Sequence, residues 1–253
     1  MELYRYLPLG NDKYKQRFEA FIVRQEVYLS NPRTFNDPFD KPLIALDGSP
    51  YEVDSTVDHV VKNLRRSNGR VLSPSQRILA KQQLKRRHNS VEFAKQLNER
   101  IPDSFCALCL SEENTLNPMW SHYADNHRGV CIGFKLGELK SNFEHFFRIK
   151  YQDTRPDVSI FDANDPLKFL SAFNTKHTDW SYEKEVRVVN LHSARSVPFN
   201  KNLIASIYLG SDISEDNKNF VIRLIKKHMP HVKIVLSKRD ELNLSISFEQ
   251  NEL

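Results

Sequence analysis

The sequence predicts an α+β fold with a mixed, largely antiparallel sheet and a basic helical insertion. Strand-like segments outnumber helical ones, and the two kinds do not alternate as they would in a doubly wound parallel sheet. A strongly basic stretch also interrupts the order of the strands. A chain of 253 residues, 40% of them hydrophobic, can bury one sizeable core. We therefore expect a single α+β domain over residues 1–253, with the insertion at residues 52–100.

The first forty residues are expected to form a strand, a helix, a second strand and an ordered loop. Residues 3–7 are rich in aromatic and aliphatic side chains, and residues 12–25 repeat apolar side chains at helical spacing. Residues 26–30 form the second short strand. Residues 31–40 hold two Pro and four Asn or Asp residues, which favour a loop over a helix or a central strand.

The insertion is expected to consist of two helices, at residues 52–66 and 75–99. Pro74 suits the first turn of the second helix. The segment 62–100 holds eleven Lys or Arg residues and two Glu, a local charge of +9. Because the formal net charge of the chain is +5, the remaining residues together carry −4. The basic character therefore belongs to one segment.

Seven later segments are expected to be strands, because several are rich in β-branched or aromatic residues. These are residues 105–110, 129–136, 146–151, 185–190, 203–209, 232–236 and 242–248. Helices are expected between them at residues 118–126, 166–174 and 214–228. The chain shows no internal repeat and no low-complexity tract.

Three Cys residues cannot form a disulfide framework, and the odd number suits a reducing compartment. The first residues lack the basic and apolar regions of a signal peptide. No uncharged apolar run approaches the roughly 18 residues of a membrane helix. We therefore expect a cytoplasmic protein that does not bind membranes.

Cys106, Cys109, His122 and His127 have the spacing of a C2H2 zinc finger. The two Cys, however, belong to a continuous apolar run that is typical of a strand. Positions three apart in a strand point to opposite faces, so both sulfur atoms cannot reach one metal ion. Buried free thiols are the alternative, and we expect no metal site.

The segment 180–189, Trp-Ser-Tyr-Glu-Lys-Glu-Val-Arg-Val-Val, carries the most informative chemistry. On a strand, Glu183, Glu185 and Arg187 share one face, while apolar residues lie on the other. Two carboxylates can stabilise an oxocarbenium-like transition state at a sugar carbon. The alternative is a solvated strand face with a cross-strand ion pair.

Two further segments hold polar or aromatic residues that suit a binding site. Trp120 and Tyr123 lie on one stripe of the expected helix, which is more often core than a cofactor platform, while His122 lies off that stripe. Asn36 and Asp37 lie in the expected loop, where they either cap the backbone or bond a ligand's hydroxyl groups.

Several short blocks follow one another over about residues 3–210. They are Leu-Tyr-Arg-Tyr at 3–6, Tyr-Leu-Ser at 28–30, Phe-Asn-Asp-Pro-Phe-Asp at 35–40, Met-Trp-Ser-His-Tyr-Ala at 119–124, Gly-Val-Cys-Ile-Gly-Phe at 129–134 and Trp-Ser-Tyr-Glu-Lys-Glu-Val-Arg at 180–187. With these blocks in this order, the chain resembles a bacterial domain-of-unknown-function family, family 2971. This family supplies no reaction.

More distantly, the order of an Arg, a Ser and a Glu-x-Glu is similar to the R-S-E class of ADP-ribosyltransferases. The resemblance implies a split sheet, with Arg5 on NAD phosphate or ribose and Ser111 by the nicotinamide ribose. Glu185 would be the catalytic carboxylate, and Glu183 would orient the acceptor. The candidates for binding NAD, the substrate, are Arg5, Ser111, Asn36, Asp37, Trp120, His122, Tyr123 and Arg187.

The resemblance implies an NAD-consuming enzyme, a bacterial toxin or anti-phage effector, that transfers ADP-ribose to an unknown macromolecule, a nucleic acid or a protein, or hydrolyses NAD. One alternative is a nucleic-acid-binding module that uses the basic segment, with contacts from Arg65, Arg66, Lys85, Arg86 and Arg87. A second alternative is a metal-dependent hydrolase or nuclease that uses Glu183, Glu185 and Asp37.

Overall fold

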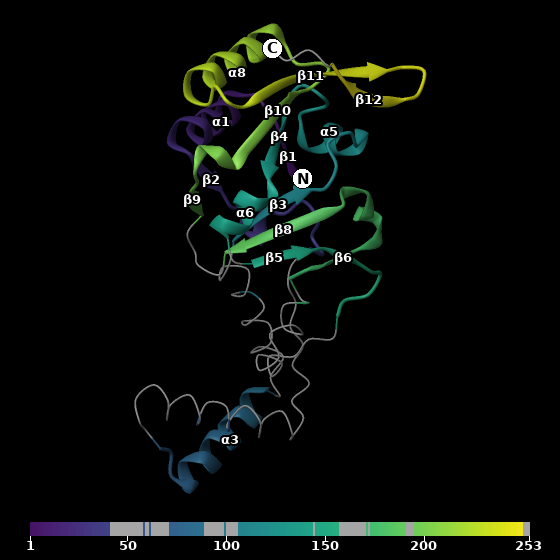
Figure 1. Cartoon of the computed structure of the whole chain (residues 1–253). Helices are drawn as coiled ribbons and strands as arrows, with labels where there is room; N and C mark the ends of the chain where they lie inside the picture. Colours follow the sequence, from purple (N-terminus) through teal and green to yellow (C-terminus); the bar gives the residue numbers. More distant parts are fainter. Residues whose placement is uncertain are drawn as a thin grey trace.

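The structure is a computed structural model, built around one large sheet (Figure 1). It describes residues 1–40, 71–88, 106–143, 145–156, 173–190 and 195–249, together with residues 58, 61, 99 and 171. The sheet is mixed and mostly antiparallel, and several helices pack on it, so the predicted α+β class is confirmed.

Eight strands form the main sheet, in the order β12-β11-β10-β4-β1-β3-β8-β5. Their bounds are β1 Glu2–Leu7, β3 Cys106–Ser111, β4 Val130–Lys135, β5 His145–Arg148, β8 Glu185–Asn190, β10 Ile204–Leu209, β11 Lys233–Asp240 and β12 Ser245–Phe248. Among neighbouring strands, β10 and β11 run parallel and the other pairs run antiparallel. Two small sheets add β2 Glu26–Tyr28 with β9 Ser196–Pro198, and β6 Lys150–Tyr151 with β7 Thr175–Lys176.

The main sheet opens between β1 and β3. These two strands pair at one position, Tyr4 with Ser111, whereas β1 pairs with β4 at six positions and β3 pairs with β8 at six. Figure 1 shows the strands on the two sides of this opening running in different directions. The sheet is therefore divided into two parts, and the opening exposes side chains of β1 and β3 to a common space.

Helices cover both faces of the sheet. Helices α1 Asp12–Arg24, α6 Leu136–Asn142 and α8 Glu215–His228 contribute to one apolar cluster, and α5 Asn117–Tyr123 contributes to the other. Helix α3 Pro74–His88 lies apart from the sheet (Figure 1), and the 3-10 helices are η1 Pro32–Thr34, η4 Thr178–Glu183 and η5 Lys201–Leu203. The side chain of Asn11 caps α1 by accepting a hydrogen bond from the Tyr14 N–H. The helix ends at Gln25, which adopts a left-handed conformation.

The core follows the period-two alternation of the strands. Leu3 of β1 packs with α1 and α8, which contribute Phe18 and Val221 to one large apolar cluster. Tyr6, on the opposite face of β1, packs with Trp120 of α5 in a smaller cluster. Because side chains alternate along a strand, Arg5 lies on the same face of β1 as Leu3, the face that α1 covers, while Tyr4 and Tyr6 lie on the opposite face.

Most predicted elements are present with shifted ends, but one predicted strand is broken, and a helix and the short strands β7 and β9 were not predicted. The expected strand at 146–151 is broken into β5 and β6, because the Lys150 N–H leaves the main sheet and donates to the carbonyl of Asn174. Helix α6 was not predicted. The expected helices at 52–66 and 166–174, and the end of the helix expected at 75–99, lie largely outside the described residues.

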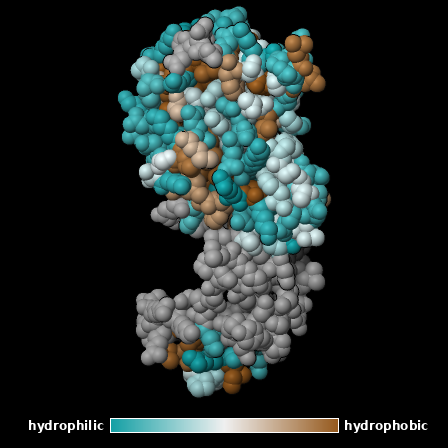
Figure 2. All heavy atoms as spheres, turned by 45° about the vertical axis from the view of Figure 1, so that its right-hand side comes forward, coloured by the Kyte–Doolittle hydropathy of each residue, from teal (hydrophilic) through white to brown (hydrophobic). Residues whose placement is uncertain are grey.

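The surface is mostly hydrophilic on the face that Figure 2 shows, with separate hydrophobic patches. The most exposed large apolar side chains include Leu242 and Leu244, between β11 and β12. No helix in the described parts of the chain combines the length and apolar character needed to span a membrane.

Candidate functional site

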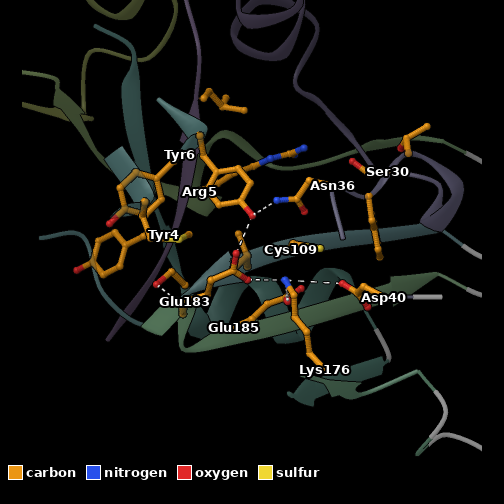
Figure 3. Close-up of a pocket in the computed structure, with 17 residues that line it drawn as sticks. Tyr4, Arg5, Tyr6, Ser30, Asn36, Asp40, Cys109, Lys176, Glu183 and Glu185 are labelled. Carbon is orange, nitrogen blue, oxygen red and sulfur yellow. Dashed lines mark hydrogen bonds and ion pairs between the residues drawn. The ribbon is translucent and has the colours of Figure 1, made fainter. Parts of the chain in front are cut away.

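A pocket of about 250 Å³ lies where the sheet opens between β1 and β3 (Figure 3). Strand β1 contributes residues 4–7 to its wall, and β3 contributes residues 109–111. The loop that follows β2 and helix α5 close other sides. The predicted residues that line it are Arg5, Asn36, Ser111, Tyr123, Glu183 and Glu185. The structure thus brings together six side chains that lie far apart in the sequence.

Glu183 and Glu185 reach this pocket from two different elements. Glu183 is the last residue of η4, and Glu185 is the first residue of β8. Lys184, between them, has φ 46° and ψ 49°, a left-handed conformation. The prediction that Glu183, Glu185 and Arg187 share the face of one strand is therefore wrong for Glu183. The turn at Lys184 is what aims Glu183 at the pocket.

The ammonium group of Lys176 lies among three carboxylates. Its Nζ atom is 2.5 Å from Glu183 Oε2, 3.3 Å from Glu185 Oε2 and 3.7 Å from Asp40 Oδ2. It also lies 4.9 Å from the centre of the Trp180 ring. Lys176 and the three carboxylates are almost completely buried, so water screens their interactions little. Figure 3 shows Lys176 between Asp40 and the two glutamates.

Arg187 completes this charge cluster from behind the pocket. Its guanidinium binds both oxygens of Asp40, at 3.1 and 2.9 Å, and both oxygens of Glu185, at 3.0 and 3.1 Å. It also lies 5.0 Å from the centre of the Phe35 ring. Three carboxylates thus face two cations, Lys176 and Arg187, which leaves one excess negative charge when all five groups are ionised. Arg187 is not among the lining residues, so it orients Glu185 rather than a ligand.

The two glutamates have opposite pKa shifts. Burial alone raises the pKa of Glu185, but the positive charges of Arg187 and Lys176 outweigh it and hold that pKa below its ordinary value. Burial dominates at Glu183 and raises its pKa, although Lys176 and Tyr123 oppose the shift. Glu185 is therefore a fixed negative charge, and Glu183 takes up a proton more readily.

Tyr123 and Asn36 form a hydrogen-bond chain to Glu183. The Asn36 amide donates to the Tyr123 hydroxyl at 2.8 Å, and this hydroxyl donates to Glu183 Oε1 at 2.6 Å. Burial and the neighbouring Glu183 raise the pKa of Tyr123, so the phenol keeps its proton. This chain orients Glu183 and connects it to the loop that carries Asn36.

Arg5 presents a cation to the pocket. Its Nη1 donates to the carbonyl of Tyr28 at 2.9 Å. Burial lowers the pKa of Arg5, and the like charge of Arg17 lowers it further. The described chain gives Arg5 no ion pair with a carboxylate. A desolvated guanidinium of this kind suits an anionic ligand.

Ser111 has a structural partner. Its hydroxyl donates to the main-chain carbonyl of Glu183 at 2.7 Å and accepts from the Glu113 N–H at 3.1 Å. Ser111 therefore holds the end of η4 against β3, and in this arrangement its proton is already engaged.

Besides Arg187, three predicted binding residues do not line the pocket. The Trp120 side chain is fully buried, stacks edge-on against Tyr6 and donates to the carbonyl of Asn114. His122 is exposed on α5. Asp37 Oδ1 accepts a hydrogen bond from the Phe39 N–H and so shapes the loop. Trp120 is therefore a core residue, the alternative interpretation of its stripe.

The cysteines of the zinc-finger spacing lie on a strand, as predicted. Cys106 and Cys109 are free thiols of β3, three positions apart, and only Cys109 lines the pocket. His127 stacks on Trp120 beyond α5. Within the described parts of the chain, no group of three or more His, Cys, Asp or Glu side chains is arranged to hold a metal ion.

Of the predicted nucleic-acid contacts, Lys85, Arg86 and Arg87 lie in helix α3, and Arg65 and Arg66 lie outside the described residues. The described part of α3 up to residue 83 is mostly exposed. Nucleic-acid binding stays a prediction.

The sequence did not identify two central residues, Lys176 and Asp40. Asp40 ends the Phe-Asn-Asp-Pro-Phe-Asp block, so attention to every acid in that block could have found it. Lys176 lies in no distinctive motif, and its role follows from the pairing of β7 with β6. Tertiary contacts alone bring its ammonium to the carboxylates.

Comparisons with curated proteins and with solved structures give no match. The likeness to ADP-ribosyltransferases therefore stays a prediction. A family model does match part of the chain, the segment 119–188, which carries Tyr123, Lys176, Glu183 and Glu185. That family is described as "Protein of unknown function (DUF2971)", and the match confirms the domain-of-unknown-function family 2971 that the sequence blocks predicted.

Proposed function

We propose that the protein consumes NAD by breaking the bond between nicotinamide and ribose, with transfer of ADP-ribose to a macromolecule or to water. One observation supports this proposal above the others: Glu183, Glu185 and Arg5 line the same pocket. The pocket thus joins a pair of carboxylates to a cation that has no carboxylate partner among the described residues.

The electrostatics of the pocket favour a cationic transition state. The sugar carbon gains positive charge as nicotinamide leaves, and a carboxylate beside it stabilises that charge. Glu185 keeps its negative charge because Arg187 and Lys176 lower its pKa. When all five groups of the cluster are ionised, it also carries one excess negative charge, so a developing cation meets an attractive field.

Glu183 suits proton transfer with the acceptor. Its pKa is raised by burial, which brings it closer to the neutral range where a general base works best. Tyr123 and Lys176 each hold one of its oxygens, so its orientation is fixed. The acceptor hydroxyl, or water, would lose its proton to Glu183 while attacking the sugar carbon.

Arg5 suits the phosphates of NAD. A guanidinium binds phosphate oxygens through two parallel N–H donors, and partial burial strengthens such bonds. Because Arg5 lies on β1 and Glu185 on β8, the ligand would span the opening of the sheet. Depletion of NAD or modification of a macromolecule would harm a cell, which supports a role as a toxin or anti-phage effector.

The test measures nicotinamide released from NAD by the purified full chain. We expect release by the wild type and a loss of about 100-fold or more in kcat for Glu183→Gln. Tyr123→Phe removes one hydroxyl and keeps the ring, and we expect a smaller loss. Glu113→Gln is the matched control, because Glu113 lies outside the pocket and pairs with Lys184 at the surface.

Glu185→Gln leaves Arg187 with Asp40 as its carboxylate partner and is expected to lose both stability and activity. Glu183→Gln and Tyr123→Phe therefore test the reaction more directly.

Two further measurements, metal dependence and labelling from NAD, separate the alternatives. Activity that disappears with EDTA and returns with a divalent cation would favour the metal-dependent hydrolase. If the wild type neither releases nicotinamide nor labels any macromolecule from NAD, the proposal is wrong.

A further inference from the structure

A second and larger pocket, of about 550 Å³, lies behind Arg5. It is lined by residues of the sheet, of helix α1 and of β2. Its wall is mainly apolar and includes Leu7, Phe18, Phe21, Ile132 and Phe134. The pocket shares Arg5, Leu7, Ser30 and Thr34 with the first pocket. The two spaces therefore adjoin, and the only charged side chain among the four shared residues is Arg5.

Two guanidinium groups flank Tyr28 at the mouth of this second pocket. Arg5 donates to the Tyr28 carbonyl at 2.9 Å, and the guanidinium of Arg17 lies 5.6 Å from the centre of the Tyr28 ring. The remaining charged residue of the lining is Glu26, whose carboxylate accepts a hydrogen bond from Ser196. The lining of the second pocket therefore has more positive than negative charge. Among the described residues, no carboxylate forms an ion pair with Arg5 or Arg17.

We propose that the second pocket binds the nucleoside end of a nucleoside diphosphate group, with the phosphates held by Arg5 and Arg17. The inference rests on the proposed function: in NAD, this group is the adenosine diphosphate part, and the nicotinamide riboside part would lie in the first pocket. Sites that bury ligands of this size usually occupy about 300–1,000 Å³. The first pocket alone is smaller than this range, so it cannot enclose a dinucleotide without its neighbour.

The chemistry of the lining matches the two parts of such a ligand. A purine ring is flat and largely apolar on its faces, so it packs well against aliphatic and aromatic side chains. The pyrophosphate carries negative charge between the two halves of the dinucleotide, where the two arginines lie. Arg17 and the second pocket were not identified from the sequence, because α1 meets β1 and β2 only in the fold.

The test measures binding of ADP to the full chain by calorimetry. Arg17→Ala removes one guanidinium from an exposed position and is expected to weaken ADP binding by about tenfold. Ala20→Phe adds a ring to α1 within the second pocket and is expected to weaken it further. Arg24→Ala is the matched control, since Arg24 is exposed on the same helix and is not among the lining residues.

Kinetics distinguish this inference from the proposed function. With NAD as substrate, Arg17→Ala and Ala20→Phe should raise KM and leave kcat nearly unchanged, whereas cleavage of nicotinamide mononucleotide should not respond to Ala20→Phe. If ADP does not bind, or binds both variants as well as the wild type, the inference is wrong even if NAD is cleaved. Binding of ADP that depends on Arg17, without any nicotinamide release, would keep this site and overturn the proposed reaction.

Discussion

Lys176 explains how three buried carboxylates coexist beside one pocket. A buried cluster of acids usually binds a metal ion or takes up protons, because like charges repel strongly where water is excluded. Here an ammonium group from the chain itself lies within 4 Å of all three. Burial lowers the pKa of Lys176, but the carboxylates raise it more, so the lysine stays charged. The sequence indicates Glu183 and Glu185 by their spacing, whereas nothing in it indicates their common partner.

The opposite pKa shifts of the two glutamates predict opposite effects of pH on stability. A carboxyl group whose pKa is lower in the folded chain adds stability above its ordinary value near 4.5, and loses it as pH falls through the lowered pKa. Glu185→Gln should therefore destabilise by about 3–5 kcal/mol at neutral pH. This difference from the wild type should shrink below pH about 4.5. The test is the free energy of urea unfolding of the wild type and the variant, measured at about ten pH values between pH 3 and pH 8.

Glu183→Gln should show the reverse dependence. A raised pKa in the folded chain adds stability at low pH, and that contribution is lost as pH rises through the raised value. The wild type should therefore lose its advantage over Glu183→Gln as pH rises above about 4.5. Parallel pH profiles for the two variants would contradict the assignment of Glu185 as the fixed charge and Glu183 as the proton acceptor.

Local patterns predicted the elements better than the turns that join them. The β-branched run of β8 and the amphipathic pattern of α1 gave both elements, with their ends within a residue or two. The sequence could not show that Lys184 adopts a left-handed conformation, because this conformation is rare outside glycine and depends on contacts at both sides. It could not show the order of strands either, since pairs such as β4 with β10 join distant parts of the chain.

The turn at Lys184 can be tested by changing its backbone preference. Lys184→Gly should leave stability within about 1 kcal/mol of the wild type, because glycine adopts positive φ without strain. Lys184→Val should cost about 1–2 kcal/mol and reduce activity, since a β-branched residue disfavours this conformation and would displace Glu183 from Lys176. Urea unfolding measures both. Glu113→Gln controls for the loss of the half-exposed Lys184–Glu113 ion pair. If Lys184→Gly and Lys184→Val lower the free energy of unfolding equally, the turn is not what positions Glu183.

The uneven charge of the chain separates the pocket from the basic segment. Arg5, Glu183 and Glu185 belong to a body that carries −4 outside the segment 62–100, which carries +9. Helix α3 holds five Lys or Arg residues and no acid. A basic helical segment attracts phosphate backbones by release of counterions, independently of base sequence. We therefore propose a nucleic acid as the partner of this segment, either as the acceptor of ADP-ribose or as a separate ligand.

Salt dependence tests this partner. The affinity of the full chain for a short DNA duplex should fall with salt, with a log–log slope of about −0.9 for each phosphate that the protein neutralises. Lys85→Ala, Arg86→Ala and Arg87→Ala, combined, should weaken binding and reduce the slope by up to about 0.9 for each phosphate that the variant no longer neutralises. Two double variants that remove the same charge provide the comparison.

One replaces Arg65 and Arg66 within the basic segment, and the control replaces Lys226 and Lys227, two exposed residues of α8 outside that segment. Because both double variants lower the net charge equally, a general electrostatic effect would change their DNA affinities equally and contradict a dedicated surface. A reduced slope confined to the basic segment would instead place the phosphate-binding residues there.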